Sequence, residues 1–213
     1  MYIGYHEFKS GKKYLYVKEC LDGSRTFLRN ILFIHHPDSY KKIAVVHEFG
    51  EKATASYEPP KGQMEWKEVE GYSNESKIEP KQLVKFMKEA VLREIGEEAK
   101  FLPSELKKLK LIPFSYEEKF EGAPLKSDKF RYMFWSACAT DASMLKAQRR
   151  IKHMIEEPDH IQLLPSDVRE KDHVCWFELK SKDDYKYIRR SFSLKMTKLY
   201  YENIDSISLI LDA

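Results

Sequence analysis

The sequence has few cysteines and lacks the long apolar runs of membrane proteins. Its 213 residues include three cysteines, Cys20, Cys138 and Cys175, which are far apart and lie in apolar or strand-like runs. This pattern indicates buried thiols in a reducing compartment. No apolar run approaches the ~20 residues of a membrane span, and the N-terminus lacks the layout of a signal peptide. We therefore expect a cytoplasmic protein without a membrane partner.

Zinc-ligand spacing is also absent, and the net charge is slight. The seven histidines are scattered, and the His35-His36 pair has no partner at metal-ligand spacing. A net charge of +3 does not by itself indicate nucleic-acid binding. Lysine and arginine nevertheless gather at Leu106–Lys110, Lys146–Lys152 and Lys186–Lys198. Each cluster is either a solvated face or a surface for phosphate groups.

The apolar content of 42% and aromatic content of 13% are sufficient for one buried core, so we expect a single domain over residues 1–213. The chain contains no repeat or linker, and its oligomeric state, monomer or homodimer, stays open. Apolar patterning predicts seven strands, at Tyr2–His6, Lys13–Cys20, Thr26–His35, Lys42–Phe49, Lys108–Phe120, Phe130–Thr140 and His173–Leu179.

Three segments have the spacing of helices. Pro80 suits a first helical turn, and apolar residues then recur at intervals of three and four, which predicts a helix from about Pro80 to Ala99. The segments Ala142–Glu157 and Lys182–Ile204 show similar spacing. The prolines and glycine of Tyr57–Gly62 predict an irregular loop, and the polar residues of Val69–Ile78 predict a surface loop.

Three carboxylates stand at the end of the first predicted helix. Glu94, Glu97 and Glu98 occupy positions i, i+3 and i+4, which on an α-helix places them on one face within about 5–6 Å. Like charges at this spacing destabilise a helix unless a partner offsets them. Hard oxygen ligands suit Mg²⁺ or Mn²⁺. A solvated acidic helix face is the alternative interpretation.

The residues around these carboxylates resemble the signature of the Nudix hydrolases. That signature reads glycine, five residues, glutamate, seven residues, then Arg-Glu-apolar-any-Glu-Glu-any-Gly-apolar. Gly62 and Glu68 match its first half with the spacing intact, and the run from Arg93 to Glu98, followed by Phe101, matches its second half. The resemblance implies the α/β fold class, with a Nudix-type α/β/α sandwich, a mixed β-sheet and a C-terminal helix at about residues 182–204.

Two features depart from the signature. Between Glu68 and Arg93 lie 24 residues where the signature has seven, so the box contains an enlarged loop at about residues 69–79. In addition, Lys100 stands where the signature has its closing glycine. The insertion changes the loop and the start of the helix, whereas the run of carboxylates is unbroken.

The resemblance implies a role for each matched residue. Glu94, Glu97 and Glu98 would be catalytic residues that bind Mg²⁺ or Mn²⁺, and the backbone carbonyl at Gly62 would complete the metal site. Arg93 and Glu68 would be structural, with the guanidinium holding the loop carboxylate.

Many family members have a further catalytic glutamate six residues before a tryptophan. Glu170 lies six residues before Trp176, so we expect it to be a distal metal ligand or general base. The alternatives for this role are Glu117, Glu118, Glu156 and Glu157.

The signature implies cleavage of a phosphoanhydride bond in a nucleoside-diphosphate-linked or other polyanionic substrate. More loosely, the chain resembles the mRNA-decapping Nudix proteins of large DNA viruses, through the run Glu58-Pro59-Pro60-Lys61-Gly62, the apolar segment Phe130–Ala139 and the segment Arg190-Ser191-Phe192. This second resemblance implies capped RNA as the substrate. Diphosphoinositol polyphosphates, dinucleoside polyphosphates and nucleoside triphosphates are alternatives.

Some proteins of this fold have lost catalysis and bind only RNA or proteins, usually with the glutamates of the box replaced. All three glutamates are present here, which favours an enzyme. The residues expected to contact the substrate are basic or aromatic, namely Lys61, Trp66, Arg149, Arg150, Arg189 and Arg190.

Overall fold

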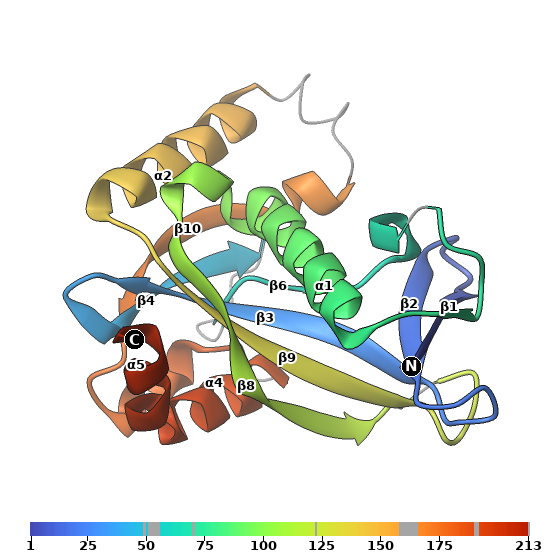
Figure 1. Cartoon of the computed structure of the whole chain (residues 1–213). Helices are drawn as coiled ribbons and strands as arrows, with labels where there is room; N and C mark the ends of the chain where they lie inside the picture. Colours follow the sequence, from blue (N-terminus) through green and yellow to red (C-terminus); the bar gives the residue numbers. More distant parts are fainter. Residues whose placement is uncertain are drawn as a thin grey trace. The chain divides into compact units, whose positions relative to one another are not determined.

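The computed structural model describes residues 1–48, 50, 56–69, 71–121, 123–157, 166–189 and 192–212. The chain forms two compact units (Figure 1). The first unit contains Met1–Ile31, Lys61–Arg93 and Pro113–Phe134, and the second contains Leu32–Pro60, Glu94–Ile112 and Trp135–Ala213. Strands β3 (Thr26–His36), β8 (Lys107–Lys119) and β9 (Lys129–Cys138) contribute residues to both. The single domain expected from the sequence therefore stays a prediction.

The first three predicted strands form an antiparallel meander in the first unit. Strand β1 (Tyr2–Glu7) pairs with β2 (Lys13–Lys18) from Tyr2↔Lys18 to Glu7↔Lys13, and β2 pairs with β3. On the other edge of β1 lies β7 (Ser76–Lys77), which belongs to the segment inserted in the Nudix-like box. The insertion was expected to be a surface loop, but part of it extends this sheet.

Residues around Gly62 also form more regular structure than the sequence predicted. Strand β5 (Tyr57–Glu58) and strand β6 (Lys61–Gln63) lie on either side of two prolines, and β6 pairs antiparallel with β3 through Asn30↔Gly62. The expectation of an irregular loop over Tyr57–Gly62 was therefore wrong for Tyr57–Glu58 and for Lys61–Gly62. The prolines lack an N–H group, but the three residues after them can join a ladder.

Helix α1 (Pro80–Glu94) begins at the predicted proline and buries an apolar stripe made of Leu83, Phe86, Met87, Ala90 and Val91. The sequence predicted that this helix continues to Ala99. Instead, α-helical bonding ends at Glu94, and a π-helix follows over Ile95–Ala99. Apolar periodicity cannot distinguish the two, because Ile95 and Ala99 are buried in either case.

The second unit has helices on both faces of its strands (Figure 1). Strand β4 (Ser39–Glu48) pairs antiparallel with β10 (Lys171–Glu178) and with β5. Helix α2 (Asp141–Glu156) packs against β10 on one face, and α4 (Phe192–Glu202) and α5 (Ile204–Asp212) lie on the other. This layering is the α/β/α arrangement expected from the sequence, with mainly antiparallel pairing.

Two adjacent histidines on β3 show the two faces of the second unit. The Nε2 atom of His35 lies 2.7 Å from the Tyr200 hydroxyl on α4, whereas Nε2 of His36 lies 3.2 Å from Asp141 at the start of α2. Neighbouring side chains of a strand point to opposite faces, so each histidine contacts a different helical layer. Tyr200 also stacks on Phe33 with ring centroids 3.7 Å apart, and both are fully buried.

The C-terminal helix is interrupted. The sequence predicted one helix over Lys182–Ile204, but the structure has a 3₁₀ helix at Lys182–Tyr187, extended backbone at Ile188, and then α4 and α5. The Ser181 side chain accepts from Asp183 N, and the Asp184 carboxylate accepts from Ser181 N, so these residues cap a short turn.

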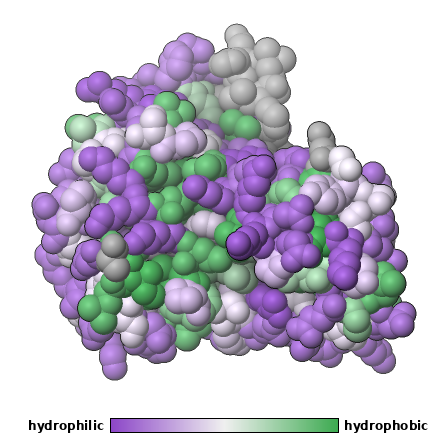
Figure 2. Space-filling model, in the orientation of Figure 1, coloured by the Kyte–Doolittle hydropathy of each residue, from purple (hydrophilic) through white to green (hydrophobic). Residues whose placement is uncertain are grey.

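The surface of the described residues carries both polar and apolar side chains. Figure 2 shows hydrophilic residues over much of one face with hydrophobic patches between them. The exposed large apolar residues are Leu21, Val84, Leu102, Leu125, Leu145 and Leu209. No described helix is long and apolar enough to cross a membrane.

Burial of His35 gives a pH-dependent stability. Burial lowers the pKa of His35 to about 4, although the hydrogen bond to the Tyr40 carbonyl acts in the opposite direction. The folded-state pKa lies below the unfolded value of about 6.5, so stability is fully present above pH 6.5 and is lost as the pH falls towards 4. We expect this group to contribute about 3 kcal/mol to that loss.

The measurement is urea unfolding at a series of pH values between 4 and 7 for the wild type and His35→Gln, which cannot be protonated in this range. The variant should have a shallower dependence of unfolding free energy on pH. The control is His153→Gln, because His153 is exposed. Equal slopes for His35→Gln and the wild type would contradict the assignment.

Candidate active site

An ion pair joins the two halves of the Nudix-like box within the first unit. Arg93 Nε donates to Glu68 Oε1 at 2.7 Å, and the other carboxylate oxygen of Glu68 accepts from the Glu65 backbone N–H at 2.6 Å. Burial raises the pKa of Glu68, whereas the Arg93 guanidinium lowers it. The pair therefore attaches the 3₁₀ turn Trp66–Val69 to the end of α1 across the insertion.

The three glutamates of the box lie where α1 passes into the π-helix. Glu94 is the last residue of α1, and Glu97 and Glu98 lie in the π-helix, whose wider turn changes the α-helical positions assumed from the sequence. Glu94 and Glu97 are half-buried, whereas Glu98 is only 5% exposed. Irregular helical turns of this kind are frequent at functional sites.

Lys100, which stands where the signature has its closing glycine, has a left-handed backbone conformation. Its φ is +58° and its ψ is 21°, a left-handed conformation that costs a non-glycine residue roughly 1–2 kcal/mol. The Lys100 ammonium donates to the carbonyls of Glu97 and Val168, at 2.6 and 2.5 Å. Burial lowers the pKa of Lys100 to about 8. These hydrogen bonds hold the helix end to the 3₁₀ turn Ser166–Arg169.

Glu98 belongs to a buried cluster of charges in the second unit. The ammonium of Lys171, at the start of β10, lies 2.9 Å from Glu58 Oε1 and 3.5 Å from Glu98 Oε1. Lys171 is 2% exposed and Glu58 is 1% exposed. The Ser193 hydroxyl donates to the second oxygen of Glu58 at 2.7 Å. We call Glu58, Glu98, Lys171 and Ser193 the Lys171 cluster.

Coulombic attraction keeps the buried lysine charged. Burial disfavours the ammonium form, but Glu98 and Glu58 outweigh it and raise the pKa of Lys171. At the edge of the cluster, Arg189 pairs with Glu48 and lies 3.9 Å from Glu58. Carboxylates and cations thus alternate through this buried region.

Carboxylate oxygens are the ligands that Mg²⁺ and Mn²⁺ prefer. Among the residues that the structure describes, no three His, Cys, Asp or Glu side chains are grouped so that they could hold a metal ion. Glu98 contacts the Lys171 ammonium instead. The metal site expected from the helical spacing therefore stays a prediction.

Gly62 lies in β6 of the first unit, whereas the three glutamates belong to the second. Glu170 is exposed and directly precedes Lys171. Its alternatives Glu156 and Glu157 stand at the end of α2, beside Lys152 and His153.

The remaining alternatives lie on β8 in the first unit. Glu117 pairs with Arg131, and Glu118 accepts a hydrogen bond from the Tyr132 hydroxyl. The second unit therefore contains Glu170, Glu156 and Glu157 together with the box glutamates, whereas Glu117 and Glu118 belong to the other unit.

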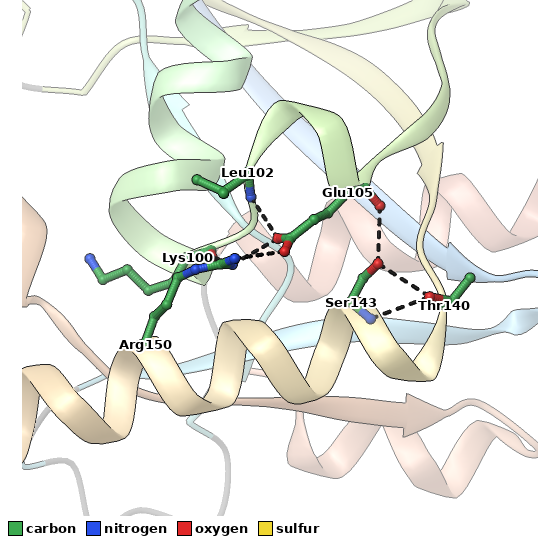
Figure 3. A network of polar contacts seen from close by, with 6 residues as sticks. All are labelled: Lys100, Leu102, Glu105, Thr140, Ser143 and Arg150. Carbon is green, nitrogen blue, oxygen red and sulfur yellow. Dashed lines mark hydrogen bonds and ion pairs between the residues drawn. The ribbon is translucent and has the colours of Figure 1, made fainter.

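Two of the arginines expected to contact substrate are engaged by carboxylates of the protein. Arg150 binds both oxygens of Glu105, at 2.6 and 2.7 Å (Figure 3). Arg189 pairs with Glu48. These contacts give both arginines a structural role that their sequence clusters did not reveal.

The other expected substrate contacts are placed differently. Arg149 is exposed on α2, and Lys61 is half-buried in β6. Trp66 packs against Tyr5 with ring centroids 4.9 Å apart. Arg190 lies outside the described residues.

Sequence reasoning missed Glu58 and Lys171. Glu58 was noted only as part of the proline-containing run, and Lys171 stands in the polar segment before a predicted strand, where a lysine usually faces solvent. Its position directly after Glu170 was only a weak signal of a role in the site. The two carboxylates that its ammonium contacts, Glu58 and Glu98, come close to it only in the folded chain.

The chain was compared with protein families, curated proteins and solved structures. No protein-family model and no curated protein matches the chain. Among solved structures, a NUDIX hydrolase from Nitrosomonas europaea is similar with a TM-score of 0.41 and 12% identity, over 84% of this chain and 90% of that chain. The functional assignment therefore depends on the box residues and on the geometry around them.

Replacing Lys171 tests how much its positive charge contributes to the unfolding free energy. In Lys171→Met, Glu58 and Glu98 keep their burial but lose the ammonium, so we expect a loss of about 3–5 kcal/mol of unfolding free energy. Adding Glu58→Gln should recover part of the lost unfolding free energy, since this change removes one of the buried carboxylates that have no ammonium partner. Urea unfolding of Lys171→Met, Glu58→Gln and the double variant measures the coupling.

The control for this cycle is Lys152→Met, because Lys152 is exposed on α2. It should unfold within about 0.5 kcal/mol of the wild type. A Lys171→Met variant as stable as this control would show that the buried pairs do not support the fold.

Proposed function

We propose that the protein is a Nudix hydrolase that cleaves a phosphoanhydride bond in a nucleoside-diphosphate-linked substrate and uses Mg²⁺ or Mn²⁺. The Arg93–Glu68 ion pair carries this proposal. Because 24 residues separate the two halves of the signature, the sequence alone does not show whether these halves meet in the fold. A direct contact between the two residues supports treating them as one interrupted box.

The conformation of Lys100 gives further support. This position requires a left-handed residue at the end of the helix, which is the reason that a glycine is favoured there. Lysine adopts the same conformation and adds hydrogen bonds through its side chain. The departure from the signature at Lys100 is thus compatible with the same backbone turn.

The proposal includes a divalent metal because the carboxylate oxygens of the glutamates are suitable ligands for Mg²⁺ and Mn²⁺. When bound, such an ion would neutralise phosphate charge and activate water. Glu97 and Glu94 are half-buried, and Glu98 would have to exchange its contact with Lys171 for the metal. The exposed Glu170 is proposed as the additional acid–base residue of this unit.

As the substrate we propose the 5′ cap of mRNA, acted on in the cytoplasm. Cap-removing enzymes need cationic groups for RNA phosphates. The exposed basic side chains of the second unit, which include Arg149, Lys152, Lys186 and Lys198, support this choice. A diphosphoinositol polyphosphate or a dinucleoside polyphosphate has similar charge, so the experiment includes both.

The test is turnover of a substrate panel with Mg²⁺, with Mn²⁺ and with EDTA. The panel contains cap-labelled RNA, a dinucleoside polyphosphate, a nucleoside triphosphate and a diphosphoinositol polyphosphate. We expect metal-dependent release of the methylated nucleoside diphosphate from cap-labelled RNA. Turnover of another member only would reject the decapping assignment, and no turnover of any member would reject the enzyme.

The matched variant is Glu97→Gln, which replaces one proposed metal-binding carboxylate. We expect its rate to fall by at least about a hundredfold, since even outer-shell partners of metal sites contribute about 10–100-fold. Glu89→Gln is the control, because Glu89 is exposed on α1 beside Lys85. Equal rates for Glu97→Gln and Glu89→Gln would show that Glu97 is not in the site.

A further inference from the structure

A cavity of about 450 Å³ lies in the second unit, and no residue of the Lys171 cluster is among the residues that line it. Its walls come from the 3₁₀ turn Pro103–Glu105, the end of β9 and the start of α2. Small-molecule sites commonly occupy about 300–1,000 Å³. The cavity is therefore large enough for a ligand of nucleotide size.

The acidic group of this cavity is already neutralised. Glu105 receives a bidentate contact from Arg150 and a hydrogen bond from the Leu102 backbone N–H at 2.9 Å (Figure 3). The hydrogen bond from Arg150 lowers the pKa of Glu105, so the carboxylate stays ionised and paired. Arg150 also donates to the Lys100 carbonyl at 2.8 Å, which holds the guanidinium in place.

The cations that remain are Lys107 and Lys146. Both line the cavity and are exposed, and neither has a carboxylate within 4.0 Å among the described residues. Arg150 and Glu105 cancel, so the walls carry two net positive charges. The hydroxyls of Ser104 and Ser143 add groups that can donate to an anion.

We propose that this cavity binds the diphosphate group of a nucleotide-sized ligand. Two lysine ammonium groups act as separate point charges, which suits two linked phosphate groups better than one carboxylate. The ligand is either a free nucleoside diphosphate or the 5′ diphosphate end of an RNA. This inference goes beyond the proposed hydrolysis, because binding here requires neither the box glutamates nor a metal ion.

The first experiment is calorimetric titration of the full chain with inorganic pyrophosphate in EDTA at fixed salt. The variant is Lys107→Ala/Lys146→Ala, and the control is Lys81→Ala/Lys88→Ala, which removes the same charge from exposed positions of α1 outside the cavity. We expect the affinity to fall at least about tenfold in the cavity variant and less than about threefold in the control. Equal losses, or no binding to the wild type at millimolar pyrophosphate, would overturn the proposal.

A second readout uses the thiol that lines the cavity. Bound pyrophosphate should slow alkylation of Cys138 and leave the exposed Cys20 unchanged. Binding without protection of Cys138 would place the ligand elsewhere and overturn the proposal.

Two further ligands distinguish the sources of the diphosphate. Tighter binding of ADP than of pyrophosphate, with protection of Cys138, identifies a nucleotide site. Tighter binding of an RNA with a 5′ diphosphate than of the same RNA with a 5′ hydroxyl identifies an RNA-end site. These titrations contain no metal, so their failure leaves the hydrolysis test unaffected, and a failed hydrolysis test leaves them interpretable.

Discussion

The buried ammonium of Lys171 is the interaction on which the second unit depends. It brings Glu58 from β5 and Glu98 from the π-helix to the first residue of β10, and Ser193 of α4 completes the contacts. Four segments that are distant in the sequence thus meet at one charge. An isolated ammonium or carboxylate would be costly at this burial, so the groups stabilise the fold only as a set.

The same cluster connects stability with the proposed chemistry. Glu98 is one of the three glutamates of the Nudix-like box, yet in this structure it contacts a lysine. A metal ion and Lys171 would compete for the same carboxylate. Under the proposed function, Lys171 would therefore both stabilise this structure and oppose the binding of a cation by Glu98.

Much of the fold was predictable because local patterns determine it. The meander, Pro80 at the start of α1, and strands β9 and β10 follow from alternation, periodicity and proline, and their boundaries differ from the predicted ones by a few residues. The π-helix was not predictable, since Ile95 and Ala99 fit an α-helical stripe equally well. The break at Ile188 was missed because Ser181 and Asp184 start a separate short turn.

The residues of the box were predictable from a signature, whereas their surroundings were not. Local spacing could not reveal that Lys171 contacts Glu98, nor that Arg150 is held by Glu105, because both contacts join segments far apart in the chain. The π-helix also changed the geometry assumed for the three carboxylates.

The most direct test of this account is a crystal structure of the protein soaked in Mn²⁺, with the ion located by anomalous scattering. The account predicts a Mn²⁺ ion coordinated by the carboxylates of Glu97 and Glu98, with the Lys171 ammonium displaced from Glu98 and still bound to Glu58. Mn²⁺ bound away from these glutamates, with the Lys171–Glu98 contact intact at saturating metal, would contradict it.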